Sequence, residues 1–429
     1  MKLSSVIDNV ITGDWGSDAY SEQSPCGVHC IRSADIVPYY NSIFDGVPIR
    51  YISKNSFNTR QLHEGDIVIE KSGGTNDCST GRTMYVSKEL LEANPLLVCS
   101  NFCAAFRVKE GWDSRFIYYF LRLVHSKGVF HNFEGKTSGI HNLQMEAAFD
   151  VIDLPNLTLD EQKKAANLLS DIDSKLANNR KQNAILENIV KQIYDYWFVQ
   201  FDFPDENGRP YKIYGGKMVW NEKLKREIPE GWEVKNLIDI ADIVNGATPS
   251  TSDETNYGGN IMWITPKDLS DQGQKFIFHG ARTISQKGYD SCSTSMLPKG
   301  SILMSSRAPI GLFAIAQNEV CTNQGFKSFV PKDETDGMYL YYYLRQHIKQ
   351  IEQLGTGTTF KEVSRDDLKK FPILYVTDRN TYLQWVEKLR PMFDLQAKLQ
   401  EESEDLQSLR SYLLPLLMTG QAKLKKDDN

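Results

Sequence analysis

The sequence contains no long apolar run. Its strongest apolar cluster, residues 413–418, is six residues long and includes Pro415, whereas a membrane-spanning helix needs about 20 apolar residues. Near the start of the chain, Asp8 and Asp14 interrupt any apolar core of a secretion signal. We therefore expect a cytoplasmic protein that makes no contact with a membrane.

Cysteine is scarce. Seven cysteines are spread over 429 residues, and an odd, sparse set is typical of unpaired thiols in a reducing compartment. Cys26 and Cys30 share the spacing of Cys99 and Cys103, which suits either a zinc site or one buried face of a strand. The core interpretation is favoured over the zinc site, and no metal site is predicted.

An excess of positive charge is also missing. The chain has 49 basic and 55 acidic residues, a net charge of −6, which excludes a protein whose whole surface attracts nucleic acid. Residues 1–155 carry 14 basic and 18 acidic groups, and residues 231–377 carry 15 and 16. A nucleic-acid site must therefore be a local patch on a nearly neutral domain.

A long internal repeat is the clearest positive feature. Similar segments recur in the same order, at offsets of 220 to 235 residues, which indicates a duplication. The drop in offset from 235 to 222 places about 13 extra residues in the first copy, between Gly65 and Val98. The paired segments are 31–35 with 264–268, 62–65 with 297–300, 98–101 with 320–323, and 118–122 with 341–345.

Each copy begins with a mixed region, residues 1–155 and 231–377. Short β-branched or aromatic runs, bounded by Gly, Pro, Asn and Asp, predict strands. Tyrosine-rich blocks at 116–124 and 338–348 predict helices. The predicted fold class is α+β, with two tandem globular domains.

Each copy ends with a long predicted helix, at 156–198 and 378–426, and residues 199–230 form a linker. Thr158 and Glu161 have the spacing of a capping box. Apolar residues at alternating spacings of three and four predict a paired helix, although a helix packed on its own domain is the alternative. Asn179 and Asn183 interrupt the first stripe.

The duplication predicts that the two helices pair. Two equivalent halves related by a rough twofold place the helices antiparallel, as a coiled coil, with the C-terminus near the first domain. Pro391 is expected to break the second helix and Pro415 to kink or end it. The predicted pairing residues are Leu169, Ile172, Leu176, Leu186, Ile193, Leu399, Leu406 and Leu413.

Motifs for catalysis are near misses. Gly135-Lys136-Thr137 lacks the spacing of a phosphate-binding loop, because Gly128 lies too far ahead of Gly135. Glu134 and Lys136 have the spacing of a nuclease metal site, but the matching segment of the second copy has no acid. The histidines form no metal-binding pair, so we predict no catalytic residue.

Polar, glycine-containing turns recur at equivalent places in both copies. Basic side chains and backbone N–H groups suit phosphates, hydroxyls suit phosphates or base edges, and amides suit adenine. Each turn alone is typical of an ordinary surface loop, and only the recurrence favours DNA binding. The candidates are Lys71, Ser72, Gly73, Thr75, Asn101, Lys136, Thr137 and Ser138 in the first copy, and Ser305, Ser306, Arg307, Asn323, Gln324, Thr356 and Thr358 in the second.

An ordered set of short motifs resembles the specificity subunit of type I restriction–modification enzymes over essentially the whole chain. The first domain departs from the pattern, since residues 13–16 read Gly-Asp-Trp-Gly where Thr-Pro-Ser is expected. The motifs are Ile-Pro-Glu-Gly-Trp at 228–232, Asn-Gly-Ala-Thr-Pro-Ser at 245–250, Trp-Ile-Thr-Pro at 263–266, Leu-Pro-Lys-Gly at 297–300, and 413–421, with 195–198 and 215–218 also similar.

The resemblance implies a non-catalytic subunit with two target-recognition domains, each reading one half of an asymmetric, bipartite target in double-stranded DNA. It implies that the helices dock two DNA methyltransferase subunits and that a restriction or motor subunit joins them. S-adenosylmethionine, ATP and magnesium would then be bound by those partners and not by this chain. The alternatives are a self-contained nuclease or methyltransferase, and a structural coiled-coil scaffold.

Overall fold

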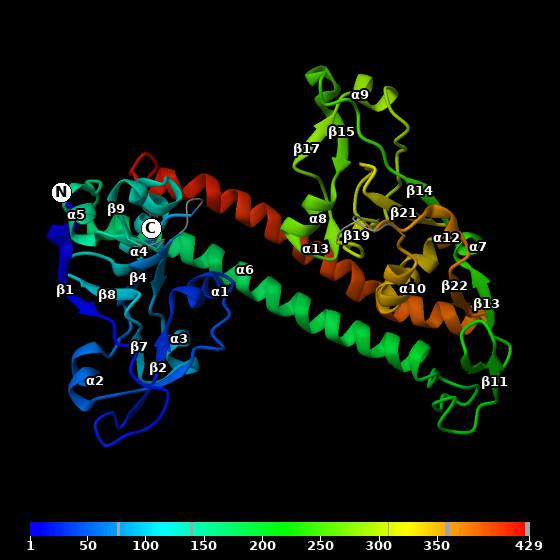
Figure 1. The fold of residues 1–429 in the computed structure, drawn as a ribbon, viewed down its shortest axis with the longest axis horizontal. Coiled ribbons are helices and arrows are strands. Elements are labelled where there is room, and N and C mark those ends of the chain that lie inside the picture. Colours follow the sequence, from blue (N-terminus) through cyan, green and yellow to red (C-terminus); the bar gives the residue numbers. More distant parts are fainter. Residues whose placement is uncertain (75–77, 138–139, 308, 357–360, 425–429) are drawn as a thin grey trace, which may run out of the picture. The chain divides into compact units, whose positions relative to one another are not determined.

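The computed structural model describes residues 1–74, 78–137, 140–307, 309–356 and 361–424 (Figure 1). It divides into two compact units, Met1–Asn178 with Ser403–Asn429, and Asn179–Glu402. Each unit combines one α+β domain with part of two long helices, α6 (Leu159–Tyr194) and α13 (Arg379–Met418). The α+β class is confirmed, and the predicted segment boundaries stay a prediction. No helix among the described residues is long and apolar enough to cross a membrane.

The first unit contains three small sheets. α4 (Ser114–Ser126) packs on the largest sheet with Phe116, Ile117 and Leu121 fully buried. Asp113 ends the preceding loop and caps this helix by accepting from the Phe116 amide at 2.9 Å. The sheets are β1 (Ile7–Thr12), β8 (Cys103–Val108), β4 (Ile67–Glu70) and β6 (Thr83–Tyr85); β3 (Ile49–Ile52), β2 (Cys26–Ile31) and β7 (Leu97–Cys99); and β5 (Ser72–Gly74), β10 (Ile140–Leu143) and β9 (Glu134–Thr137).

Short helices fill the connections of the first unit. They are α1 (Ile36–Tyr40), α2 (Lys54–Arg60), α3 (Lys88–Ala93) and α5 (Met145–Val151), with a 3-10 turn at Leu3–Val6. Ser53 and Ser87 cap α2 and α3 by accepting backbone amides. The polar residues at these helix starts therefore explain where the helices begin.

The second unit repeats the four-stranded sheet and the β3-β2-β7 sheet of the first unit, and it also contains one hairpin and one pair of strands that lie far apart in sequence. Its sheets are β14 (Ala241–Asn245), β21 (Phe326–Pro331), β18 (Ile302–Ser305), β19 (Phe313–Ala316) and β16 (Phe276–Ile277); and β17 (Arg282–Ile284), β15 (Tyr257–Ile264) and β20 (Cys321–Thr322). The pairs are β11 (Met218–Asn221) with β12 (Arg226–Pro229), and β13 (Glu233–Asn236) with β22 (Pro372–Tyr375). Its helices are α7 (Leu237–Ile240), α8 (Pro266–Gln272), α9 (Gln286–Asp290), α10 (Gly337–Gln346), α11 (Ile348–Gln353) and α12 (Arg365–Lys369).

The strand topology confirms the internal repeat. The order β1-β8-β4-β6 recurs as β14-β21-β18-β19. In the smaller sheets, β2 is antiparallel to β3 and parallel to β7, and β15 is antiparallel to β17 and parallel to β20. In both copies, therefore, the central strand has one antiparallel and one parallel neighbour.

The register of the repeat differs by one residue from the predicted match of 98–101 with 320–323. Ile31 lies opposite Cys99, and its counterpart Ile264 lies opposite Thr322. Cys99 therefore corresponds to Thr322, an offset of 223. Four similar residues can be aligned one position out without losing their similarity. A strand cannot be shifted in this way, because a one-residue shift turns every side chain to the other face.

The extra residues of the first domain lie in two places. The amide of Glu70 bonds the Arg82 carbonyl, and the amide of Ser305 bonds the Leu312 carbonyl. Eleven residues lie between the bonded residues in the first of these connections and only six in the second. The remaining insertion contains α3, for which the second domain has only a short turn between β19 and β20.

In the first unit, the beginning of α6 packs against the end of α13. Nε of Arg410 lies 2.6 Å from Oδ1 of Asp173, and Lys423, just beyond α13, pairs with Glu161 at 2.8 Å. Residue numbers rise along one helix as they fall along the other, so the two run antiparallel. The end of α13 also shares a core cluster with residues 3 and 6, which places it against the first domain, as predicted.

The second unit shows the same antiparallel order. Nδ2 of Asn179 donates to Oε2 of Glu402 at 2.8 Å, and Nε2 of Gln396 donates to the Asn183 carbonyl at 3.4 Å. The Asn179 side chain thus makes a polar contact across the helix pair, of the kind that selects one register, whereas Asn183 takes part through its backbone carbonyl. The predicted antiparallel pairing is confirmed within both units.

The second long helix differs from its prediction in two respects. α13 continues through Pro391 and Pro415. Pro391 is exposed, so water can solvate the Glu387 carbonyl that loses its bond. The apolar stripe predicted for this helix includes Leu395 and Leu409 at the same alternating spacings of four and three. It is rotated away from the partner helix there, because these two side chains are 42% and 45% exposed. Of the predicted pairing residues, Leu169, Ile172, Leu176 and Leu399 are buried, and Leu186, Ile193, Leu406 and Leu413 are half-buried.

A carboxylate of α6 anchors each domain to the helices. In the first unit, the Tyr119 hydroxyl donates to Asp173 at 2.9 Å, and Arg122 lies 3.7 Å from the same oxygen. Both side chains come from α4, which carries the Tyr-Tyr-Phe-Leu-Arg motif of the repeat. Asp173 also pairs with Arg410 of α13, so one carboxylate joins the domain and both helices.

The second domain builds the equivalent anchor with Glu187. The Tyr342 hydroxyl of α10 donates to Oε2 at 2.8 Å, and Arg345 lies 3.4 Å from Oε1. Lys275 lies 2.6 Å from Oε2 and also donates to Gln396 of α13. Burial lowers the pKa of Lys275 to about 8 despite the neighbouring carboxylate.

Truncation of a buried helix residue should cost far more stability than truncation of an exposed one. Leu169 is fully buried, whereas Leu409 is 45% exposed. We expect Leu169→Ala to lose about 2–5 kcal/mol because it leaves a cavity, and Leu409→Ala to lose less than about 1 kcal/mol. The midpoints of thermal unfolding measure the difference. Equal midpoints for the two variants would contradict the helix packing described above.

Candidate nucleic-acid interface

The candidate residues of each domain gather where β4 or β18 ends. In the first domain, the amides of Lys71 and Ser72 both donate to the Phe102 carbonyl, at 2.8 and 3.1 Å. In the second domain, the Ser306 amide donates to the Gly325 carbonyl at 2.7 Å. The chain therefore leaves both strands along the same path, directed by the turn that precedes β8 or β21.

A cross-strand pair occupies equivalent positions in the two domains. The Leu143 amide bonds the Lys71 carbonyl, and the Val363 amide bonds the Ser306 carbonyl. The next residues, Ser72 and Arg307, then correspond to each other. Ser72 Oγ donates to Oδ1 of Asn142 at 2.5 Å, and Arg307 Nε donates to Oε2 of Glu362 at 3.0 Å.

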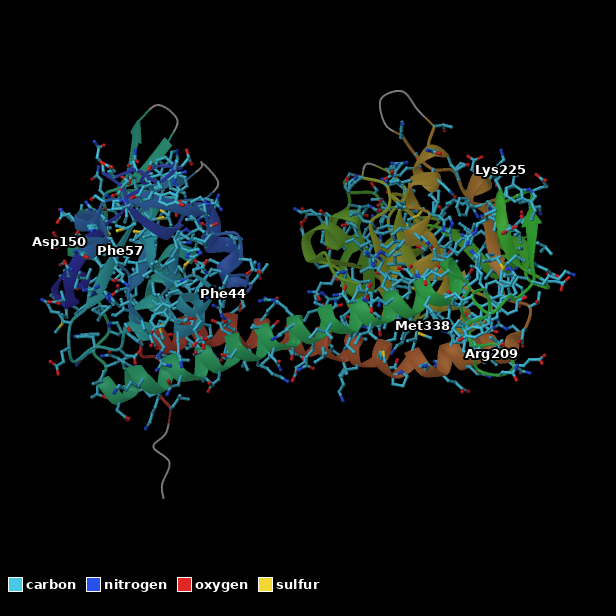
Figure 2. The ribbon with its side chains drawn as sticks, turned by 90° about the horizontal axis from the view of Figure 1, so that it is seen from below. Phe44, Phe57, Asp150, Arg209, Lys225 and Met338 are labelled. Atoms are coloured by element: carbon cyan, nitrogen blue, oxygen red, sulfur yellow. The ribbon has the colours of Figure 1, made fainter. Side chains whose placement is uncertain are left out.

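The same framework thus carries a neutral pair in the first domain and an ion pair in the second. The strand pairing behind it is also shared, because β10 lies between β5 and β9, and Glu362 bridges both Arg307 and Thr356. Figure 2 shows β9 and β10 extending beyond the side chains of the first unit's body.

Two predicted contact residues lie inside the second domain, so the prediction that they contact DNA is wrong. Ser305 and Ser306 are fully buried. The Ser305 hydroxyl donates to the Pro309 carbonyl at 2.7 Å, and the Ser306 hydroxyl lies 3.2 Å from the Gly325 carbonyl. Their hydroxyls therefore shape the loop from within and are not presented to a duplex. Two serines at the start of a loop gave no sign of burial, because the sequence does not show which face of the loop is covered.

The amide side chains are held by their oxygens. Oδ1 of Asn101 accepts from the Trp15 amide at 3.0 Å, and Oε1 of Gln324 accepts from the Thr248 hydroxyl at the corresponding place. Oδ1 of Asn323 accepts from the Gly325 amide at 2.9 Å. With the oxygens engaged, the NH2 groups are the parts best placed to donate, which suits acceptors such as phosphate or guanine better than bidentate pairing with adenine.

Gly73 follows the first strand for a steric reason. Its φ is +127°, and a Cβ there would lie 3.2 Å from Oε1 of Glu70. Glu70 is fully buried and makes two hydrogen bonds to Arg82, at 2.7 and 2.5 Å. The loop therefore closes over a buried ion pair that a larger residue would disturb.

Glu134 is a site residue whose structural role the sequence did not reveal. Oε1 accepts from the Thr80 amide at 2.6 Å and from the Thr80 hydroxyl at 2.8 Å, and Oε2 lies 2.9 Å from Nδ1 of His141. Burial alone raises the pKa of Glu134, but the Thr80 and His141 contacts outweigh it and lower the pKa below 4.5. The carboxylate that matched a nuclease motif instead ties the β9–β10 hairpin to the loop that precedes β6.

The remaining candidates are placed as follows. Lys71 is half-buried, and Arg307 and Thr356 are exposed. Lys136 and Thr137 belong to β9, where the backbone is described. Thr75, Ser138 and Thr358 lie outside the described residues. Within the described part of the chain, no cluster of three or more His, Cys, Asp or Glu side chains could hold a metal ion.

Comparison with known proteins gives consistent matches. A family model described as the type I restriction modification DNA specificity domain matches residues 31–188 and again residues 229–397. The type I restriction enzyme MjaIX specificity subunit of Methanocaldococcus jannaschii is 41% identical over 165 residues, which cover 37% of this chain and 38% of that protein. The HindI specificity subunit of Haemophilus influenzae is 25% identical over 330 residues, covering 64% and 71%.

A solved structure has the same fold. The S subunit of a type I restriction-modification system from M. genitalium superposes with a TM-score of 0.60 at 14% sequence identity, over 97% of this chain and 95% of that one. The fold is therefore shared along nearly the whole chain, whereas the match to the M. jannaschii relative spans less than half of that protein.

Glu134→Gln should destabilise the first domain in a pH-dependent way. Because the pKa of Glu134 is lowered in the fold, its stabilisation is present above the ordinary pKa of a glutamate and is lost as pH falls through the lowered value. We expect the variant to lose about 1–3 kcal/mol at pH 7 and the difference from wild type to shrink as pH falls from 7 into the acidic range. Thermal midpoints across this range measure the difference.

Glu146→Gln is the matched control, because Glu146 is exposed on α5. It should differ little from wild type at every pH. A Glu134→Gln protein with wild-type midpoints throughout would show that the Thr80 contacts contribute no stability.

Proposed function

The chain belongs to the family of type I restriction modification DNA specificity domains and carries two copies of that domain, and from this premise we propose that it is the DNA-reading subunit of a type I restriction–modification enzyme. The observation that carries the proposal is the equivalent pair at the end of β4 and β18. Ser72–Asn142 and Arg307–Glu362 occupy one framework with different chemistry. Two domains that share a backbone framework but carry different side chains at these positions suit two different DNA sequences.

Each domain reads one half of a bipartite target, and a set number of base pairs separates the two halves. The exposed side chains at the loop ends provide a guanidinium group, amides and a hydroxyl, which contact base edges and phosphates. Because the two sets differ, the target is asymmetric. A structural scaffold has no need of such loops, which argues against that alternative.

The chain itself carries out no chemistry in this proposal. Both oxygens of Glu134, the acid of the nuclease-like motif, are bonded within the domain. S-adenosylmethionine, ATP and magnesium are bound by the partners, which are two DNA methyltransferase subunits and a restriction or motor subunit. The cytoplasm, where DNA and these partners meet, is the proposed location.

The long helices offer a docking face for a methyltransferase subunit. Ile185, Ile189 and Tyr196 of the second unit are 50%, 37% and 37% exposed. Spacings of four and seven residues place them along one side of the helical segment. Apolar side chains left uncovered in this way on a helix favour packing against another protein.

The target should tolerate changed bases but not a changed length in its central gap. One added base pair rotates one half-site by about 35° relative to the other, so a domain can no longer face its groove. Footprinting and affinity measurements on duplexes with the gap lengthened or shortened by one pair test this. A palindromic target, or one indifferent to gap length, would contradict the proposal.

Exchange of residues 1–155 for the matching domain of another family member is the complementary experiment. It should change one half-site and leave the other as in wild type. A change in both half-sites would mean that the domains do not read independently.

The purified chain alone should neither methylate nor cleave DNA, with or without magnesium, ATP and S-adenosylmethionine. Methylation should arise when a methyltransferase subunit is added. Ile185→Asp with Ile189→Asp should abolish this gain and leave DNA binding unchanged, because both side chains are exposed on α6 and neither belongs to the loops proposed to contact DNA. Turnover by the lone chain that disappears in Glu134→Ala or Lys136→Ala would favour the self-contained enzyme instead.

A further inference from the structure

Three charged residues from three separate segments of the second domain form a row of ion pairs, in which Lys327 belongs to β21 and Arg307 and Glu362 lie outside the named strands and helices. Lys327 of β21 lies 3.1 Å from Oε1 of Glu362, and Arg307 Nε lies 3.0 Å from Oε2. The side chain of Lys327 is 8% exposed, that of Glu362 is 36% exposed and that of Arg307 is 48% exposed. The row of ion pairs therefore runs from the buried ammonium of Lys327 to the exposed guanidinium of Arg307.

This arrangement fixes the orientation of Arg307. Oε1 of Glu362 accepts a hydrogen bond from the buried Lys327, and Oε2 accepts one from Nε of Arg307. A backbone bridge between Arg307 and Glu362 fixes the two residues side by side. Among the described residues, the terminal nitrogens of Arg307 have no hydrogen-bond partner in the protein. The planar fork thus has its Nε engaged and its two outer donors available.

A fork of two parallel donors has a specific complement in DNA. Guanine presents the acceptors N7 and O6 in the major groove, and arginine binds both at once. A guanidinium held in place by a carboxylate loses less conformational freedom when it binds. Resting on the function proposed above, we propose that Glu362 positions Arg307 to read a guanine in the half-site of the second domain.

The first domain lacks this device at the equivalent position. Ser72 and Asn142 are uncharged and cannot present a fork of two donors. A hydroxyl and an amide offer donors and acceptors together, which match an adenine–thymine pair better than guanine. The requirement for guanine therefore belongs to the second half-site alone at this structural position.

The decisive variant keeps the charge and removes the fork. Arg307→Lys should lower the preference for guanine at one position of the second half-site by about 5- to 150-fold, while the salt dependence of binding stays close to wild type. The full-length chain with its methyltransferase partner is used to select bound duplexes from a pool randomised in both half-sites. Binding to the selected duplexes is then measured over a range of salt concentrations.

Glu362→Gln tests the positioning role directly. The guanine preference should fall, although Arg307 itself is intact, and binding to unrelated duplex should strengthen because a negative charge near the phosphates is removed. Since this variant leaves Lys327 buried beside a neutral group, a second protein carries Glu362→Gln with Lys327→Met. It removes the buried charge together with its partner and should show the same loss of guanine preference.

Two matched controls separate this effect from general damage. Arg365→Lys changes an exposed arginine of α12 in the same way and should leave the selected sequences unchanged. Ser72→Ala alters the corresponding pair in the first domain and should change only the first half-site. If Arg365→Lys lowered the guanine preference as much as Arg307→Lys, the assignment of the fork to Arg307 would be overturned.

The outcomes distinguish this inference from the function on which it rests. If wild type selects a bipartite target and Arg307→Lys selects the same target with equal strength, the positioning role is wrong and the DNA-reading function stands. If Glu362→Gln leaves the guanine preference intact while Arg307→Lys abolishes it, Glu362 does not position the fork. If wild type selects no sequence at all, the proposed function itself fails.

Discussion

Two carboxylates of α6 are the points on which the architecture depends. Asp173 and Glu187 each bind a tyrosine hydroxyl and an arginine, from α4 in the first domain and from α10 in the second. Asp173 also contacts Arg410 of α13, and Glu187 also contacts Lys275 of the second domain. Loss of either acid would leave buried tyrosines and cations without their acceptor. The domains are thus attached through charge-assisted hydrogen bonds with defined directions, and not through apolar packing alone.

The duplicated framework separates what is kept from what varies. Strand order, the path of the chain beyond β4 and β18, and the tyrosine–arginine anchors recur in both units. The side chains at the loop ends differ, and so does the length of the loop between β4 and β6. A subunit built in this way can change what it reads without altering how it folds.

Sequence reasoning predicted the repeat, the α+β class and the antiparallel helices, because each depends on periodicity or similarity over many residues. It placed the strand register one residue out, since the similarity around Cys99 extends over only four residues. It missed the burial of Ser305 and Ser306 and the continuity of α13 through Pro391, which depend on which faces the tertiary structure covers. The roles of Glu134 and Glu362 depend on partners 54 and 55 residues away, a distance that no local pattern reveals.

The first unit is discontinuous in sequence, whereas the second is one uninterrupted stretch, Asn179–Glu402. During synthesis on the ribosome, the second unit has all its residues before the first does. The core around Leu3 and Val6 waits for Leu417 and Met418, which are among the last residues of α13 to emerge. Synthesis of the first unit therefore begins first and is completed last. Until it is complete, its apolar surface is exposed and must be protected from aggregation.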